Sequence, residues 1–334
     1  MKFPSVSIVS ISYNSDLGIF KKTLDAIASQ NYPKENIEHI IMDAGSTNGS
    51  LALMKRYRTK VFIRKDLLEK PLVRMSLGMK KAKNSLILLL EPDNIMIGKT
   101  WLKEMVQPFI DSPDVVAAFS KYNAYEKSMP SFTKYCALFG INDPIVYYLH
   151  KSEKLPRYMS KYSTGGNMRE RNGYTLVDFN SDNLPTLGDN GHMVRRAVIN
   201  TVNKNPEEYL HTDAFMELVA NGHKLFAVVD NSVIHYTGSS IVSFYKRRIE
   251  YKARYFDKQR KKRQYLVYNS DSSADRINLL LFIFYSLTFV QPFILSMRGF
   301  LYIPEPAWFL HPIACFLAVC SYGYSELRSY SMSK

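Results

Sequence analysis

The chain has 334 residues, of which 46% are apolar and 22% charged, so it can bury a core and is neither disordered nor collagen-like. Lys and Arg outnumber Asp and Glu by 44 to 30, and the formal net charge of +14 favours an anionic partner such as nucleic acid, a lipid surface or a phosphate-bearing ligand. The three cysteines include no C-x-x-C pair, so they neither form a disulfide framework nor match a thiolate zinc site, and they indicate a reducing compartment.

The N-terminal part of the chain alternates apolar runs with stretches of helical spacing. Predicted strands cover residues 6–11, 37–42, 61–63 and 85–90, and predicted helices cover residues 17–27 and 71–83. The first run has no basic region before it and no cleavage site after it, so it predicts a strand and not a signal peptide. The alternation predicts an α/β fold with a mostly parallel central sheet.

Polar side chains follow three of these strands, at the edge of a parallel sheet where ligands bind. They are Tyr13 and Asn14 after the first strand, Asp43 after the second, and Glu91, Asp93 and Asn94 after the fourth. Two carboxylates one residue apart in a turn suit Mg²⁺ or Mn²⁺. Each also has a simpler explanation, because an Asp after a strand often shapes its own turn and a strand-end Glu is often merely solvated.

Further along the chain the pattern is less specific. Residues 120–185 hold many Tyr and Lys side chains and match no motif. Asp213 lies early in a predicted helix that runs toward Asn221, where an acidic side chain ordinarily complements the helix dipole. His235 closes a predicted strand over 232–235, which follows another over 225–229; a lone His at a strand end is more often structural than a ligand.

The C-terminal third has a different character. Residues 246–263 hold ten Lys and Arg side chains against two acidic ones, interleaved with aromatic residues, as in a helix on an anionic membrane surface. Charge alone leaves nucleic-acid binding open, but no nucleic-acid motif supports it. Residues 277–297 contain no charged side chain and are long enough to cross a bilayer, whereas residues 307–322 are a weaker span. We expect a transmembrane hairpin or, alternatively, a re-entrant or interfacial one.

Several segments, in order, resemble family 2 glycosyltransferases of the GT-A fold. They are VSIVSISYN, SQNYPKENIEHIIMDAGSTNGS, AKNSLILLLEPDN, GDNGHMVRRAVI and HTDAFMELVANGHKLFAVVD. Each motif is loose by itself, and their order and spacing make the likeness specific over residues 4–240. The resemblance implies a nucleotide-sugar donor, a divalent metal (Mg²⁺ or Mn²⁺) and an inverting transfer.

The resemblance also implies roles for individual residues. It places the nucleotide-sugar at Tyr13, Asn14, Asp43 and Arg248, with the Tyr13 ring against the base; lipid headgroup contact is the alternative for Arg248. It places the metal at Glu91, Asp93 and His235, and the general base for the acceptor hydroxyl at Asp213.

The sequence departs from the family pattern at several positions. Glu91 replaces the usual first Asp of the metal motif, and Thr212 replaces a frequent Glu. Ala44 stands where a second Asp is common, and Met75-Ser76 stands where an Arg-Asn pair is common. The Gln-x-x-Arg-Trp motif of processive synthases is absent, so we expect a single transfer per encounter.

Together these features predict a GT-A catalytic domain over residues 1–240 and a basic amphipathic membrane-surface segment over 241–275. A hydrophobic transmembrane or re-entrant hairpin follows over 276–325, and a tail over 326–334. The predicted enzyme moves one sugar from a nucleotide-sugar to a lipid-linked or glycolipid acceptor, with its catalytic domain on the cytoplasmic face of the membrane and no nucleic-acid partner. The alternatives are a catalytically inactive relative that acts as a membrane scaffold and a nucleic-acid-binding membrane protein.

Overall fold

The computed structural model describes residues 3–188, 190–237, 240–253 and 262–332. Position 189 of the Gly-rich segment and residues 254–261 of the basic segment therefore lie outside the described residues. The chain divides into two compact units, the first containing residues 1–124 and 165–235 and the second containing residues 125–164 and 236–334. Residues 125–164, which the sequence analysis assigns to the catalytic domain, fold in this division with the C-terminal segment.

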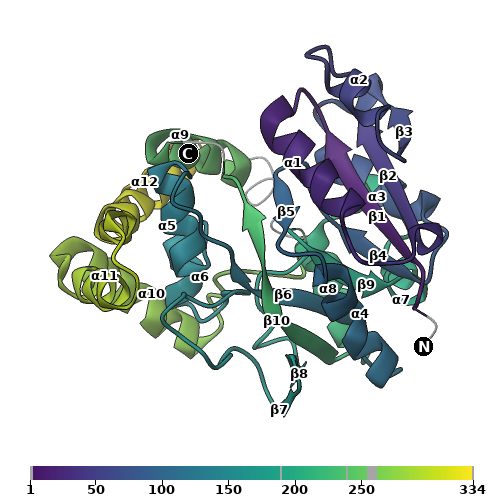
Figure 1. Ribbon diagram of the computed structural model, residues 1–334. Helices are drawn as coiled ribbons and strands as arrows, with labels where there is room; N and C mark the ends of the chain where they lie inside the picture. Colours follow the sequence, from purple (N-terminus) through teal and green to yellow (C-terminus); the bar gives the residue numbers. More distant parts are fainter. Residues whose placement is uncertain (1–2, 189, 238–239, 254–261, 333–334) are drawn as a thin grey trace. The chain divides into compact units, whose positions relative to one another are not determined.

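A mixed sheet forms the centre of the first unit (Figure 1). Its strands in the described residues are β1 (Val6–Ser12), β2 (Ile37–Asp43), β3 (Lys60–Ile63), β4 (Leu86–Leu89), β5 (Asn94–Met96), β6 (Ala117–Asn123), β7 (Met168–Arg171), β8 (Tyr174–Asp178), β9 (His192–Arg195) and β10 (Leu225–His235). The order is β3-β2-β1-β4-β9-β6-β10-β8-β7, with β5 paired to β10. Strands β3, β2, β1 and β4 are parallel, and β9 runs antiparallel to β4 and β6. The predicted α/β fold with a mostly parallel core is confirmed.

The helices of the first unit pack on this sheet. They are α1 (Leu17–Ala28), α2 (Ser50–Met54), α3 (Pro71–Lys81), α4 (Trp101–Asp111), α7 (Arg196–Val202) and α8 (His211–Ala220), with 3₁₀ turns at Lys34–Asn36, Lys65–Leu67 and Pro206–Glu208. Helix α1 begins where the Asp16 carboxylate accepts a hydrogen bond from the Ile19 N–H, and α3 begins with Pro71, whose fixed φ suits the first turn. Phe20 and Leu24 of α1 are buried against β2, so the predicted helical spacing is confirmed.

His39 in β2 is a buried histidine beside β1. The Ser10 hydroxyl donates to the Leu90 carbonyl at 2.6 Å, and it lies 3.0 Å from His39 Nε2, so the imidazole donates to Ser10. Burial lowers the pKa of His39 to about 4, which means that the folded chain keeps this ring neutral where the unfolded chain protonates it.

We expect His39 to make the unfolding free energy depend on pH. Because its folded pKa lies below the unfolded value of 6.5, the stability that it confers is complete above pH 6.5 and falls by up to about 3 kcal/mol as the pH approaches 4. Urea unfolding between pH 7 and 4 should therefore show a shallower pH dependence for His39→Gln than for the wild type. His223→Gln, in a half-buried position, is the control, and equal slopes for His39→Gln and wild type would contradict the assignment.

The second unit is helical. It contains α5 (Ser131–Phe139), α6 (Pro144–Tyr148), α9 (Ile241–Tyr251), α10 (Ser273–Thr288), α11 (Val290–Tyr302) and α12 (Leu310–Met332), with a 3₁₀ turn at Pro306–Phe309. Trp308 is fully buried, and the Phe139 ring lies 4.8 Å from it. Because α5 and α6 carry apolar faces that bury against α10, α11 and α12, residues 125–164 are held in this unit and not by the sheet.

The two apolar stretches of the predicted transmembrane or re-entrant hairpin take different forms, and α10 with α11 fits a broken span or a re-entrant loop. The stretch 277–297 is not one helix, because α10 ends at Thr288, Phe289 has a left-handed backbone with φ of 62°, and α11 leaves at an 80° bend. Pro292 fits the first turn of a new helix and would break the interior of a continuous one. Among the described residues, one helix, Pro306–Arg328, is long and apolar enough by itself to cross a membrane. It contains residues 307–322, the weaker of the two predicted spans.

Candidate functional site

Asp43 ends β2 and organises the turn that follows. Its carboxylate accepts hydrogen bonds from the N–H groups of Gly45 and Ser46 at 2.8 and 2.7 Å and from the Ser46 hydroxyl at 2.6 Å. The side chain is fully buried. Gly45 has φ of 90°, and a Cβ there would lie 2.6 Å from Lys65 Cγ, so this turn requires glycine. In this structure Asp43 shapes the loop, and its contact with a nucleotide stays a prediction.

The loop after β1 is tied to the loop after β2. Asn14, with φ of 46°, donates its N–H to the Ser46 hydroxyl at 2.8 Å, and its side-chain oxygen accepts from the Thr47 N–H at 2.8 Å. Tyr13 beside it has 45% of its surface exposed. The two loops therefore form one rigid rim that presents an exposed aromatic ring, the feature that a packing partner for a base requires.

The acidic turn Glu91-Pro92-Asp93-Asn94 follows β4 as predicted. Asn94 is buried and holds the turn, because its side chain bonds to the Glu91 N–H at 3.3 Å and to Asp93 Oδ1 at 3.1 Å. Thr23 of α1 donates to the Pro92 carbonyl at 2.7 Å. Asn94 is thus a positioning residue, whose role depends on a turn geometry that spacing alone does not reveal.

Asp93 and His235 converge at this edge of the sheet. β5 pairs with the end of β10, so that Asn94 lies opposite His235, and His235 Nε2 comes within 4.0 Å of Asp93 Oδ2. The His235 side chain is 15% exposed and the Asp93 side chain is 44% exposed, so both can contact a ligand. Each comes from a different part of the chain, and the sheet register brings them together.

The predicted trio of metal ligands is not assembled. Across the residues that the structure describes, no group of three or more His, Cys, Asp or Glu side chains could hold a metal ion. Burial lowers the pKa of the Arg74 guanidinium, and the Glu91 carboxylate opposes this shift. Asp93 and His235 still fit a divalent cation, since Mg²⁺ typically takes one or two protein carboxylates and completes its shell with phosphate oxygens and water.

Arg74 is a residue at this edge of the sheet that none of the sequence motifs singles out. It lies on α3, is 5% exposed, and donates through Nη1 to the Ser12 carbonyl at 2.6 Å and the Met42 carbonyl at 3.3 Å. Burial lowers the pKa of its guanidinium, while the carboxylates of Glu91 and Asp43 raise it. Arg74 thus links the ends of β1 and β2 and places a positive charge beside two acids.

Asp213 lies in the first turn of α8, as predicted, and is half-buried. The start of this helix is tied to the acidic edge of the sheet through the loop before β9. Gly191 donates its N–H to Leu89 at the end of β4 at 2.9 Å, and a Cβ at Gly188 would lie 2.7 Å from Cβ of His211. This close approach brings the N-terminus of α8 to the same edge as Asp93.

Arg248 lies in the second unit, on α9, while the other predicted site residues lie in the first. Its Nε is 3.8 Å from Asp143 Oδ2, and its guanidinium stands 5.0 Å from the Phe244 ring. Tyr322 also donates its hydroxyl to Asp143. Arg248 therefore already serves the packing of its own unit, and a diphosphate contact stays a prediction.

Comparison with known proteins adds a family and a fold. Residues 7–180 match the family model described as Glycosyl transferase family 2. Over 115 residues, 33% of this chain, the sequence is 30% identical to the poly(ribitol-phosphate) beta-N-acetylglucosaminyltransferase TarS of Staphylococcus aureus (strain Mu50 / ATCC 700699). The match spans about a fifth of that relative, 19% of its length.

Two solved structures are similar over most of the chain. The mannosyltransferase PcManGT from Pyrobaculum calidifontis, in complex with GDP-Man and Mn²⁺, has a TM-score of 0.53 at 11% identity, with 96% of this chain and 87% of that chain covered. The structure of S. aureus TarS 1–349 with UDP-GlcNAc has a TM-score of 0.47 at 15% identity, with 99% of this chain and 92% of that chain covered. At such low identity the first likeness supports the fold alone.

Proposed function

From the premise that the chain belongs to glycosyl transferase family 2, we propose that it is an inverting enzyme that transfers a single sugar from a nucleotide-sugar to a lipid-linked acceptor. The chain is a glycosyltransferase with the GT-A fold. The observation that carries the finer proposal is the approach of Asp93 and His235 at the edge of the sheet where the Asp43 loop and the start of α8 also lie.

The residues on this edge divide the work of the reaction. The Tyr13 ring and the Asn14–Asp43 loops hold the base and ribose, and Arg74 fixes the spacing of these loops. Asp93 and His235 would hold a divalent cation, which acts as a Lewis acid on the diphosphate leaving group when it is bound.

Asp213 is the proposed general base. The acceptor hydroxyl oxygen forms a bond to the anomeric carbon from the face opposite the leaving group, and its proton passes to the Asp213 carboxylate. The bond between the anomeric carbon and the diphosphate oxygen breaks, and the nucleoside diphosphate leaves with the electron pair. One displacement with one base inverts the anomeric configuration.

The lipid-linked acceptor and the membrane setting are supported by the second unit. Its helices α10 and α11 expose large apolar side chains, including Leu280, Phe284, Val290 and Leu301 at 61–78% of their surface, and Pro306–Arg328 is a candidate span. The basic segment before these helices supports a cytoplasmic catalytic unit, because Lys and Arg next to membrane segments favour the cytoplasmic side. A polyprenyl-linked sugar or a glycolipid presented at that surface is the proposed acceptor.

The donor is tested by nucleotide release in detergent or nanodiscs with a lipid extract and Mg²⁺ or Mn²⁺. The panel starts with GDP-mannose, which is bound in the similar mannosyltransferase structure, and with UDP-N-acetylglucosamine, because the Staphylococcus aureus relative is an N-acetylglucosaminyltransferase, and it adds dTDP-sugars. We expect turnover with one donor and its loss on chelation. Absence of both turnover and nucleotide binding for every donor would favour the inactive scaffold instead.

A further inference from the structure

The second unit contains a cavity of about 340 Å³ that no part of the proposed reaction uses. Its lining comes from the chain between α6 and residue 164, and from α10 with the start of α11. Tyr147, Tyr148 and Tyr285 provide aromatic surface, and Ser152, Lys154 and Asn278 provide polar groups. All of these residues belong to the second unit, whereas Asp93 and His235 belong to the first.

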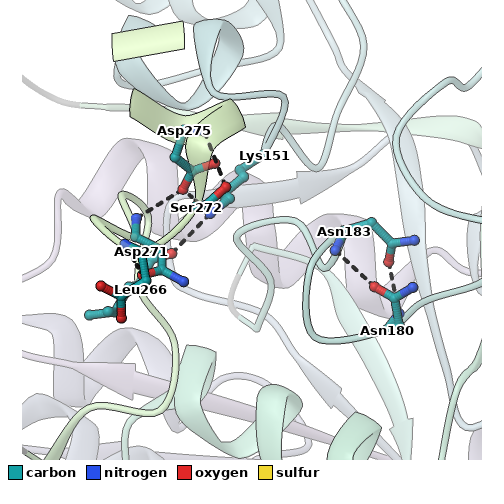
Figure 2. A network of polar contacts seen from close by, with 8 residues as sticks. Lys151, Asn180, Asn183, Leu266, Asp271, Ser272 and Asp275 are labelled. Carbon is teal, nitrogen blue, oxygen red and sulfur yellow. Dashed lines mark hydrogen bonds and ion pairs between the residues drawn. The ribbon is translucent and has the colours of Figure 1, made fainter. Parts of the chain in front are cut away.

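The walls of this cavity are held together by a buried ion pair. Lys151 Nζ lies 3.0 Å from Asp275 Oδ2 and also donates to the Leu266 carbonyl at 3.1 Å. Asp275, in the first turn of α10, also accepts from the Asn269 N–H at 2.8 Å, and Figure 2 shows Lys151 and Asp275 pointing toward one another. On the other side the Tyr148 hydroxyl donates to Gln291 at 2.5 Å. The lining is therefore preformed and does not need a ligand to assemble it.

Two polar groups in the cavity have unused hydrogen-bonding capacity. The Ser152 hydroxyl is buried in a residue that is 8% exposed and has no hydrogen-bond partner among the described residues. Lys154 is 1% exposed, and its ammonium lies 2.7 Å from Glu153 Oε1. An ammonium has three N–H donors, so this ion pair leaves at least two for another acceptor. Buried donors without acceptors are costly, which favours a ligand rich in oxygen at this point.

The apolar side of the cavity continues onto the exposed surface of α10. Leu281 lines the cavity and is itself 40% exposed. Ile277, Leu280 and Phe284 lie on the same side of the helix at spacings of three and four residues and are 58–68% exposed. A ligand that places a polar head at Ser152 and Lys154 can therefore lay an apolar chain along α10.

We propose that this cavity binds a membrane amphiphile with a phosphate head group, with the phosphate oxygens at Ser152 and Lys154 and the hydrocarbon chain along Leu281 and the neighbouring α10 surface. The amphiphile can be a bilayer phospholipid or a prenyl phosphate, since both present the same phosphate and an apolar chain. Binding does not involve the nucleotide-sugar, so it stands independently of the proposed sugar transfer.

Native mass spectrometry of the full chain in detergent tests this site, with bound adducts counted in the absence of any nucleotide-sugar. The probes are farnesyl phosphate, dioctanoyl phosphatidic acid, farnesol and inorganic phosphate. We expect adducts with the first two and at least about tenfold weaker binding of farnesol and inorganic phosphate, which lack the head or the chain. Equal binding of farnesol and farnesyl phosphate would overturn the proposal. A preference for farnesyl phosphate would identify a prenyl phosphate, and a preference for phosphatidic acid a phospholipid.

Variants locate the site on the chain. Ser152→Ala removes a buried hydroxyl that has no partner in the described residues, so it leaves the fold intact and should weaken farnesyl phosphate binding about tenfold, the factor for one hydrogen bond to a charged group. Lys154→Met should weaken it further. Ser160→Ala and Lys161→Met, at exposed positions outside the cavity, are the matched controls and should bind as the wild type does. Uptake of farnesyl phosphate by the detergent micelle is the same for all variants. If Ser152→Ala and Lys154→Met both bound it as the wild type does, this cavity would not be the binding site.

Discussion

Replacement of Asp213 by Asn is expected to lower kcat by about 10²–10⁴, the contribution of a general base, with a much smaller effect on KM for the donor. Asn keeps the size of the side chain and removes the proton acceptor. The fold should tolerate the change, because Asp213 lies in the first turn of α8, where the loss of a charge costs about 0.3–1 kcal/mol. Initial rates of nucleotide release, with thermal unfolding of the same preparations, measure the two effects.

Glu217→Gln is the matched control for Asp213→Asn. Glu217 lies one turn further along the same helix and is also half-buried, so its replacement removes an equal charge from the same element. It should change kcat by less than about twofold. If Asp213→Asn kept kcat within the same range, Asp213 would be a helix-dipole residue, the simpler explanation that its position in the sequence also allows.

Strand and helix positions in the first unit follow from the sequence because buried strands are short apolar runs and α1 has its buried residues at helical spacing. Residues 6–11 are rich in β-branched side chains and lie in β1, and α1 has Phe20 and Leu24 at the predicted buried positions. One difference is local. The two short strands predicted over 225–229 and 232–235 form one strand, β10, with a register shift between Val229 and Ser232. Asp230 in this irregularity pairs with Lys121 at 2.7 Å, so the polar residues interrupt the ladder without ending the strand.

The remaining differences depend on distant parts of the chain. Nothing local indicates that Phe289 adopts a left-handed backbone, because only Gly and a few polar residues commonly do. Arg74 becomes buried because the carbonyls at the ends of β1 and β2 meet there, which is a property of the sheet. For the same reason the sequence proposes three metal ligands, whereas the strand register brings only Asp93 and His235 together.

The Asp93–His235 pair leads to the second prediction, which separates Asp93 from Glu91. Asp93→Asn should weaken Mn²⁺ binding at least about 100-fold, since loss of a second-shell partner alone costs 10–100-fold, and it should abolish measurable turnover. Glu91→Gln should weaken Mn²⁺ binding less than about tenfold, because Asp93 and His235 are the proposed protein ligands, phosphate and water complete the shell, and the Glu91 carboxylate also interacts with the Arg74 guanidinium. Electron paramagnetic resonance of free Mn²⁺, titrated with each variant and nucleoside diphosphate, measures the dissociation constant without any need for turnover.

Asp114→Asn, at an exposed position in the same unit, is the control for these two variants. Equal losses in Asp93→Asn and Glu91→Gln would restore Glu91 as a ligand, and unchanged Mn²⁺ binding in Asp93→Asn would contradict a cation at this edge of the sheet.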